Sequence, residues 1–296
     1  YGDIPYQTIF SISESPFQFG LVYVGTDDGR VWRTDDSGAN WNEINSGLPF
    51  QKWVAELVAS KYDEGTVYMV QNGKRDDDFA PYIWKSTDYG ENWASIVGNI
   101  PSGPVNVLKE DPENPDILYV GTDLGVYVTL DGGVEWHALP GGDLPSSYYQ
   151  DLVIHPEEDI MVVATHGRGV WAMDVRPIQA MTPEVMTEPV HLFDPGSVQL
   201  PQGFRGAGGG TAIQYWVGRP GNQALIQIRD SNGTVLRELS GPAEAGLQTV
   251  PWDLSAGGQS ASVDSRGRMA RVPPGTYSVT ITVGNASSEG ELVVGR

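Results

Sequence analysis

Short stretches of alternating apolar and polar residues recur along the whole chain, and clusters of Gly, Asp, Asn and Pro separate them. A period of two places successive side chains on opposite faces of a β-strand, and such clusters are typical of hairpin turns. In the first half the pattern predicts four strands that each precede a hairpin, at 8–13, 54–60, 105–110 and 150–155. The pattern therefore predicts an all-β chain.

One short motif, [ST]-x-D-x-G-x-x-W, follows three of the hairpins. The copies consist of Thr34, Asp36, Gly38 and Trp41; Ser86, Asp88, Gly90 and Trp93; and Thr129, Asp131, Gly133 and Trp136. The tryptophans lie 52 and 43 positions apart, close to the length of a four-stranded propeller blade. A fourth hairpin, 161–171, has no motif after it. We expect a partial β-propeller of about four four-stranded blades.

The motif has a structural explanation that needs no chemistry. Its Asp can accept hydrogen bonds from backbone N–H groups of its own turn, its Gly allows a positive φ, and its Trp can pack between adjacent sheets. We therefore expect structural roles for all twelve motif residues. Calcium at Asp36, Asp88 and Asp131 is the alternative, although a D-x-G turn alone supplies few oxygen ligands. No other cofactor or metal is expected.

The second half carries a separate set of predicted strands, and the 296 residues are enough for two domains. These strands lie at 211–217, 223–230, 235–239, 247–254, 275–283 and 289–294. A segment with a proline about every six residues, ending in a Gly-rich stretch, precedes them. We expect propeller blades at 1–176, a Pro/Gly-rich strap and linker at 177–210, and a β-sandwich at 211–296.

Charge and composition exclude several classes of function. With 18 basic and 38 acidic residues, the net charge of −20 repels nucleic acid. No apolar run reaches the roughly 18 residues that span a bilayer, so direct membrane insertion is not expected. The absence of Cys excludes disulfides, thiolate metal sites and a Cys nucleophile.

The motifs, together with Tyr82–Gly90, Thr165–Trp171 and Leu192–Pro195, resemble the Asp-box (BNR, or VPS10/sortilin-like) β-propeller families. They are most similar to bacterial exported proteins of the glycosyl-hydrolase-like repeat type. The end of the chain resembles an Ig-like, FlgD-type module through 250–254 and 273–279. The resemblance implies a secreted or periplasmic protein, and the signal peptide is expected to be absent from this chain.

That resemblance covers sialidases, xyloglucan-cleaving hydrolases, sortilin-type receptors and photosystem assembly factors, so it implies a fold rather than one activity. Sialidases carry an F/Y-R-x-P motif, and the opening segment 1–5 has the Pro without the Arg. Candidate ion- or partner-binding residues are Asp76, Asp77 and Asp78 in a predicted loop, and His166 with Arg168 in the fourth hairpin. No catalytic residue is predicted.

We therefore expect an extracytoplasmic, non-catalytic protein-interaction scaffold, such as an accessory subunit on the outer face of a membrane complex. Its expected partners are other protein chains, or upstream residues that complete the propeller. The alternative is a polysaccharide-active glycoside hydrolase or a carbohydrate-binding protein. A hydrolase requires convergent carboxylates and exposed aromatic side chains in one groove, whereas a scaffold requires a large protein interface.

Overall fold

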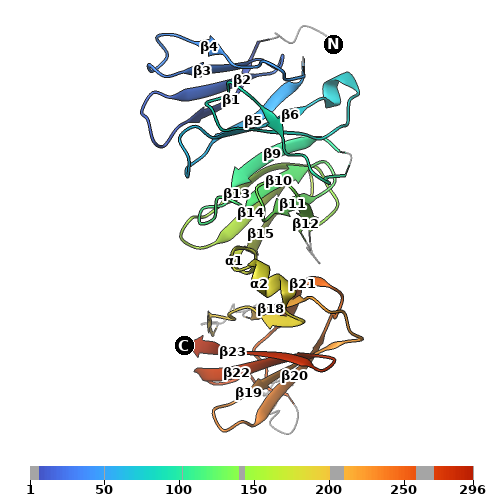
Figure 1. Ribbon diagram of the computed structural model, residues 1–296. Coiled ribbons are helices and arrows are strands. Elements are labelled where there is room, and N and C mark those ends of the chain that lie inside the picture. Colours follow the sequence, from blue (N-terminus) through green and yellow to red (C-terminus); the bar gives the residue numbers. More distant parts are fainter. Residues whose placement is uncertain are drawn as a thin grey trace. The chain divides into compact units, whose positions relative to one another are not determined.

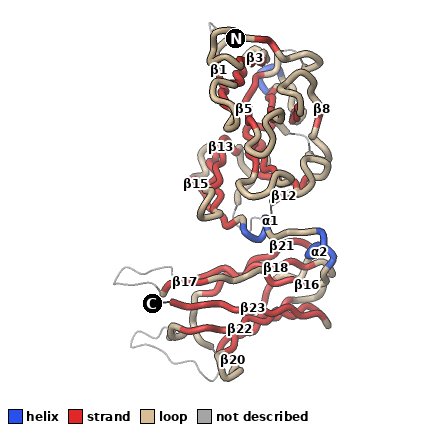
Figure 2. The backbone as a smooth tube through the Cα atoms, turned by 60° about the vertical axis from the view of Figure 1, so that its left-hand side comes forward, coloured by secondary structure: helices blue, strands red, loops and turns tan. Residues whose placement is uncertain are grey.

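The computed structural model describes residues 7–49, 51–101, 103–139, 144–200, 210–257 and 270–295. The chain separates into two compact units, 1–179 and 180–296. Strands dominate both units, and helix is confined to short segments (Figure 2). The predicted all-β fold is confirmed.

Within the described residues, the first unit contains four antiparallel sheets, and the strands of each sheet follow the order of the chain. Figure 1 shows most of these strands with their labels. Sheet 1 consists of β1 (Ile9–Glu14), β2 (Val22–Thr26), β3 (Val31–Thr34) and β4 (Asn42–Glu43); sheet 2 of β5 (Trp53–Ala59), β6 (Val67–Asn72), β7 (Tyr82–Ser86) and β8 (Ala94–Ser95); sheet 3 of β9 (Val105–Glu110), β10 (Leu118–Thr122), β11 (Val126–Thr129) and β12 (Trp136–Ala138); and sheet 4 of β13 (Tyr149–Ile154), β14 (Ile160–Thr165) and β15 (Val170–Asp174). A 3₁₀ turn, η1 (Lys74–Asp76), lies between β6 and β7.

The first strands of the four sheets lie side by side: β1 contacts β5, β5 contacts β9, and β9 contacts β13. Successive sheets are therefore arranged like blades around a shared line of inner strands, as the predicted partial propeller requires. Each inner strand contains one bulge against its neighbour, and the extra residues are Phe10, Ala55, Asn106 and Gln150. Because a bulge re-aims its side chain, these four positions differ from regular strand positions.

The core of the first unit lies between neighbouring sheets. One cluster joins sheets 1 and 2 through side chains such as Tyr23 and Leu57. A second joins sheets 2 and 3 through side chains such as Ile83 and Leu108. Burying these aliphatic and aromatic side chains removes apolar surface from water at roughly 25 cal/mol per Å². These two clusters stabilise the contact between sheets 1 and 2 and the contact between sheets 2 and 3.

Sheet 4 differs from the other three sheets. In sheets 1 to 3 the [ST]-x-D-x-G-x-x-W motif connects the third strand to the fourth. The fourth repeat lacks the motif, and in the described residues β15 is followed by the helix α1 (Arg176–Gln179). Sheet 4 thus has three strands within the described part of the chain.

The second unit consists of two sheets around one core. Strands β16 (Val190–Leu192), β18 (Thr211–Val217) and β21 (Gly246–Trp252) form one sheet, and β17 (Ser197–Gln199), β23 (Ala286–Gly295), β22 (Gly275–Val283), β19 (Ala224–Arg229) and β20 (Val235–Gly241) form the other. Buried side chains of both sheets, among them Tyr215, Trp252 and Ile281, share a single cluster. All six strands predicted for 211–296 are present.

The predicted linker at 177–210 differs from the structure. Its described part contains α1, the helix α2 (Pro183–Thr187), and the strands β16 and β17, which pair with β18 and β23. Both strands lie at sheet edges, where the prolines just before them, Pro189 and Pro195, remove no ladder hydrogen bond. Most of the Gly-rich stretch lies at 201–209, outside the described residues.

Candidate functional site

The three Asp turns share one hydrogen-bond pattern. In the first, Thr34 Oγ1 donates to Asp36 Oδ1 at 2.9 Å, and Asp36 Oδ1 accepts from the backbone N–H of Asn40 at 2.8 Å. Gly38 has a φ of 90°, and its N–H donates to Thr34 Oγ1 at 2.9 Å. The other two copies repeat these contacts at the same positions.

These hydrogen bonds leave the Asp oxygens facing the donors of their own turn. They lower the pKa of Asp36, mainly through the Asn40 backbone N–H, and that of Asp88, mainly through the Asn92 side chain. Within the described ranges, no group of three or more His, Asp or Glu side chains is placed to hold a metal ion.

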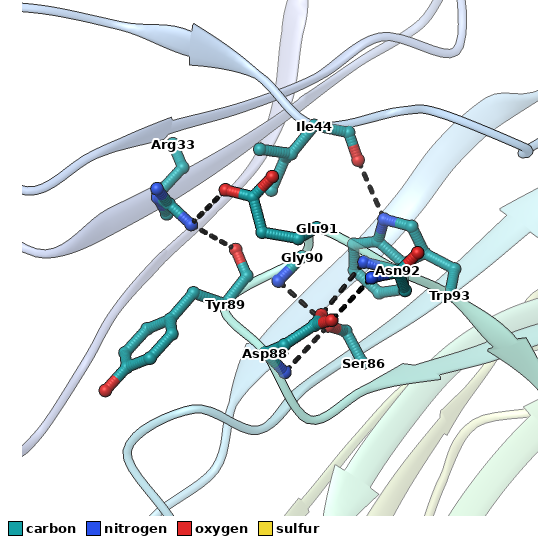
Figure 3. A network of polar contacts seen from close by, with 9 residues as sticks. All are labelled: Arg33, Ile44, Ser86, Asp88, Tyr89, Gly90, Glu91, Asn92 and Trp93. Carbon is teal, nitrogen blue, oxygen red and sulfur yellow. Dashed lines mark hydrogen bonds and ion pairs between the residues drawn. The ribbon is translucent and has the colours of Figure 1, made fainter.

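Each motif tryptophan of sheets 2 and 3 docks on the sheet before it. Figure 3 shows Trp93 Nε1 donating to the Ile44 carbonyl at 2.7 Å, beside an ion pair of 3.2 Å between Arg33 and Glu91. In the same way, Trp136 Nε1 donates to the carbonyl of Ile96 at 2.8 Å. Trp41 is the exception to the predicted packing, because its side chain is 41% exposed whereas that of Trp136 is 3% exposed.

The three consecutive aspartates at 76–78 have different surroundings. Asp78 is engaged by Lys52 Nζ at 2.7 Å, by the Tyr82 hydroxyl at 2.8 Å and by the Ala80 N–H at 3.0 Å. The hydrogen bond from Lys52 is the main reason why the pKa of Asp78 falls to about 2. Asp76 lies in η1, and Asp77 follows it with a left-handed backbone.

Replacing Lys52 with methionine is expected to raise the pKa of Asp78 towards its ordinary value of 3.8. The variant removes the cation and hydrogen-bond donor that favour the ionised form of Asp78. In the unchanged protein, the ionised Asp78 stabilises the folded state above pH ~4, and this contribution is lost as the pH falls towards 2. Carboxyl ¹³C NMR titration measures the shift, with Lys85→Met as the control. An unchanged Asp78 titration in Lys52→Met would contradict this explanation.

His166 and Arg168 lie in the exposed turn between β14 and β15. The His166 N–H donates to the Tyr148 carbonyl at 2.9 Å, and the two rings meet edge-on with centroids 6.0 Å apart. The Arg168 carbonyl accepts a hydrogen bond from Trp171 Nε1 at 3.0 Å. His166 therefore lies beside Tyr148. The described contacts of Arg168 lie within its own hairpin.

The inner strands of all four sheets line one cavity of about 410 Å³. We call it the inner-strand cavity. Its aromatic lining consists of Phe10, Trp53 and Tyr148, its carboxylates are Glu56 and Asp151, and its amides are Asn106 and Gln150. Three of these residues, Phe10, Asn106 and Gln150, occupy the bulge positions. The repeated bulge thus directs side chains from distant parts of the sequence towards one site.

The aromatic side chains of the cavity are held by each other and by two cations from η1. Phe10 and Trp53 stack edge-to-face at 4.3 Å, and the Arg75 guanidinium lies 4.5 Å from the Trp53 ring centroid. Lys74 Nζ lies 4.9 Å from the ring centroid of Tyr148. Among the described residues, the buried Trp53 Nε1 has no hydrogen-bond partner. Ring–ring and cation–π contacts thus hold the aromatic lining of the cavity in place.

The two carboxylates of the cavity occupy equivalent places, each directly after the bulge of its strand. Glu56 is largely buried, forms an ion pair with Lys109, and accepts a hydrogen bond of 2.7 Å from the Leu108 N–H. Burial raises the pKa of Glu56, the charge of Asp151 raises it further, and Lys109 opposes the rise. Asp151 is exposed. One cavity thus contains a desolvated and a solvated carboxylate, an arrangement suited to acid–base chemistry.

The comparisons with known proteins find proteins named as xyloglucanases and proteins named as sortilin. No family model matches the chain. The chain is 28% identical over 159 residues to xyloglucanase Xgh74A of Acetivibrio thermocellus, covering 48% of this chain and 19% of that protein. It is 30% identical over 149 residues to a probable oligoxyloglucan-reducing end-specific xyloglucanase of Neosartorya fischeri, with coverages of 46% and 17%. The sortilin of Rattus norvegicus is 23% identical over 129 residues, with coverages of 42% and 15%.

The matched segments thus span less than a fifth of the length of these relatives. Among solved structures, a GH74 enzyme of Niastella koreensis aligns with 97% of this chain and 47% of its own, at 12% identity and a TM-score of 0.46. No helix in the described residues is both long and apolar enough to cross a membrane.

These relatives correct the functional expectation. Several of them are named as xyloglucanases, and the non-catalytic scaffold expected from the sequence is therefore wrong. The expectation depended on finding no convergent carboxylates in the sequence, yet the folded chain brings Glu56 and Asp151 to one cavity. The comparisons favour the alternative, a glycoside hydrolase.

Proposed function

We propose that the first unit is part of a glycoside hydrolase that acts on a polysaccharide, and that the inner-strand cavity is its site. The observation that carries the proposal is the convergence of three aromatic side chains and two unlike carboxylates in this cavity. The sequence similarity to proteins named as xyloglucanases supports the same reaction class and suggests a β-glucan backbone as the substrate.

The carboxylate pair fits the chemistry of glycosidic cleavage. Such enzymes use one carboxylic acid to protonate the leaving oxygen and a second carboxylate as nucleophile or base. Glu56 is the candidate acid, because burial raises its pKa and so favours retention of its proton. Asp151 is the candidate nucleophile or base, because it is exposed and can reach an incoming sugar or water.

The aromatic lining fits the binding of a sugar ring. Pyranose rings present apolar C–H faces and hydroxyl edges, and binding sites with aromatic walls and a few polar groups match both. Phe10, Trp53 and Tyr148 supply the walls, while the Asn106 and Gln150 amides can meet hydroxyl groups.

Three finer assignments accompany this proposal. The three motifs act as Asp boxes of the propeller repeats, and their common hydrogen-bond pattern supports this assignment. The second unit is an Ig-like module, supported by its two sheets around one core. The protein acts outside the cytoplasm, in the medium or the periplasm, where polysaccharide substrates are found.

The proposal is tested by incubating the purified chain with soluble xyloglucan and with unrelated polysaccharides and measuring new reducing ends. We expect cleavage of a β-glucan that the double variant Glu56→Gln/Asp151→Asn abolishes. Glu110→Gln is the matched control, because Glu110 is also buried, has a raised pKa, and bonds Ser60 and Lys61 away from the cavity.

Two outcomes would overturn the proposal. Full activity in the double variant would show that cleavage occurs elsewhere. Binding of polysaccharide by the unchanged chain without any cleavage would reduce the cavity to a carbohydrate-binding site.

A further inference from the structure

The outer face of sheet 1 is apolar at positions that are buried in the other sheets. The bulges align the inner strands, so Ile9 occupies the position just before the bulge and Ile12 the second position after it. The equivalent residues are Val54 and Leu57 in sheet 2, Val105 and Leu108 in sheet 3, and Tyr149 and Leu152 in sheet 4. Each of these six is no more than 3% exposed, whereas Ile9 is 62% and Ile12 is 68% exposed.

The motif of sheet 1 shows the same difference. A Cβ on Gly90 would lie 2.4 Å from Ile44 of the preceding sheet, and one on Gly133 would lie 2.8 Å from Ile96. A Cβ on Gly38 would meet nothing within 3.5 Å, and its nearest neighbour is its own Trp41. Among the residues that the structure describes, none takes at the first motif the place that Ile44 and Ile96 fill at the next two.

A cavity of about 270 Å³ lies on this face, and Ile9, Val24, Trp32 and Trp41 are among the residues that line it. We define Ile9, Ile12, Val24 and Trp41 as the first-sheet face. It combines the exposed side chains of Ile9 and Ile12 with the buried Val24 and the indole of Trp41. In sheets 2 and 3 the corresponding N–H groups each find a carbonyl just after the outermost strand of the preceding sheet.

We propose that the first-sheet face binds one further four-stranded sheet of the same repeat type, which packs on sheet 1 as sheet 1 packs on sheet 2. The residue after the outermost strand of that sheet supplies a carbonyl to Trp41 Nε1 and a branched side chain over Gly38. Its inner strand supplies a hydroxyl or carboxylate to the backbone of Ile12. In this way, the Ser11 hydroxyl accepts a hydrogen bond from the Leu57 N–H at 2.8 Å, and the Glu56 carboxylate accepts one from the Leu108 N–H at 2.7 Å.

A second copy of this chain fits the face less well. The carbonyl that receives the indole always follows a fourth strand, and sheet 4 has three strands in the described residues. The terminal sheet of another copy therefore lacks the acceptor for Trp41 within that part of the chain. The occupant that satisfies every group of the first-sheet face is a four-stranded sheet. This inference is independent of the proposed hydrolase activity.

The test adds such a sheet to the chain. A copy of residues 1–52 is placed directly before Thr8, so that the added sheet reaches β1 through the same connection that joins β4 to β5. We expect the Trp41 indole N–H, followed by ¹H–¹⁵N NMR and assigned with Trp41→Phe, to exchange at least tenfold more slowly than in the unextended chain. Ile12→Lys is the matched control, which should leave the unextended chain folded and abolish the protection in the extended one.

A second extension built from residues 53–104 repeats the test, and in it the Ile96 carbonyl is the hydrogen-bond acceptor for the Trp41 indole. If neither extension protects Trp41, whether or not the added sheets fold, the proposal is wrong. Sedimentation of the unextended chain as a dimer that Ile12→Lys dissociates would identify a second copy as the occupant and would also overturn it.

Discussion

Replacing Trp136 with alanine is expected to lower the free energy of unfolding of the first unit by about 3–5 kcal/mol, while Trp41→Ala changes it by less than about 1 kcal/mol. Both tryptophans end the same motif, yet Trp136 is 3% exposed and hydrogen-bonded to Ile96, whereas Trp41 is 41% exposed. The large side chain leaves a cavity only where a neighbouring sheet surrounds it. The contrast therefore measures what the preceding sheet contributes.

Chemical denaturation followed by far-UV circular dichroism measures both variants, and hydrogen exchange of β9 to β12 separates loss of sheet 3 from loss of the second unit. Trp93→Ala should lie between the two, because Trp93 is partly exposed but bonded to Ile44. Equal losses for Trp41→Ala and Trp136→Ala would show that the motif stabilises its own turn rather than the contact between sheets.

Glu56→Gln is expected to lower kcat on a cleaved β-glucan by about 10²–10⁴-fold, the range typical of a lost general acid. Lys109→Met should instead move the alkaline limb of the pH profile of kcat/KM to higher pH. The sign follows from the charges: Lys109 lowers the pKa of Glu56 against the effect of burial, so removing Lys109 raises it, and the acid keeps its proton to higher pH.

Initial rates across a pH series measure the limb, with Lys61→Met as the matched control beside the buried Glu110 outside the cavity. The control should leave the limb in place. A limb that moves to lower pH in Lys109→Met, or that persists unchanged in Glu56→Gln, would assign the titrating acid to another residue.

Local pattern was sufficient to predict most of the strands. The predicted strand at 105–110 coincides with β9, and that at 211–217 coincides with β18. Alternation and turn residues act over a few positions, so each hairpin can be recognised on its own. The short strands β16 and β17 were missed because three residues beside prolines carry too little pattern, and only their partners β18 and β23 define them.

The candidate site could not be predicted in the same way. Glu56 and Asp151 lie 95 positions apart and meet only because β5 and β13 are both inner strands. A bulge is a property of two paired strands, so no single segment reveals that Phe10, Asn106 and Gln150 turn towards one cavity. The aspartates at 76–78 were predicted as binding residues, and their loop does reach the cavity. The residues of this loop that contact the cavity lining, however, are Lys74 and Arg75.

The Glu56 carboxylate both joins sheet 2 to sheet 3, by accepting a hydrogen bond from the Leu108 N–H, and lines the cavity. Any thermal motion that parts sheet 2 from sheet 3 breaks this hydrogen bond and exposes Glu56 to water, where its pKa returns to the ordinary range. On heating, the proposed hydrolase activity should therefore disappear at a lower temperature than strand structure. Mutations that strengthen the contact between sheets 2 and 3 should therefore raise the temperature at which the proposed activity is lost, although the mutated residues do not contact the substrate.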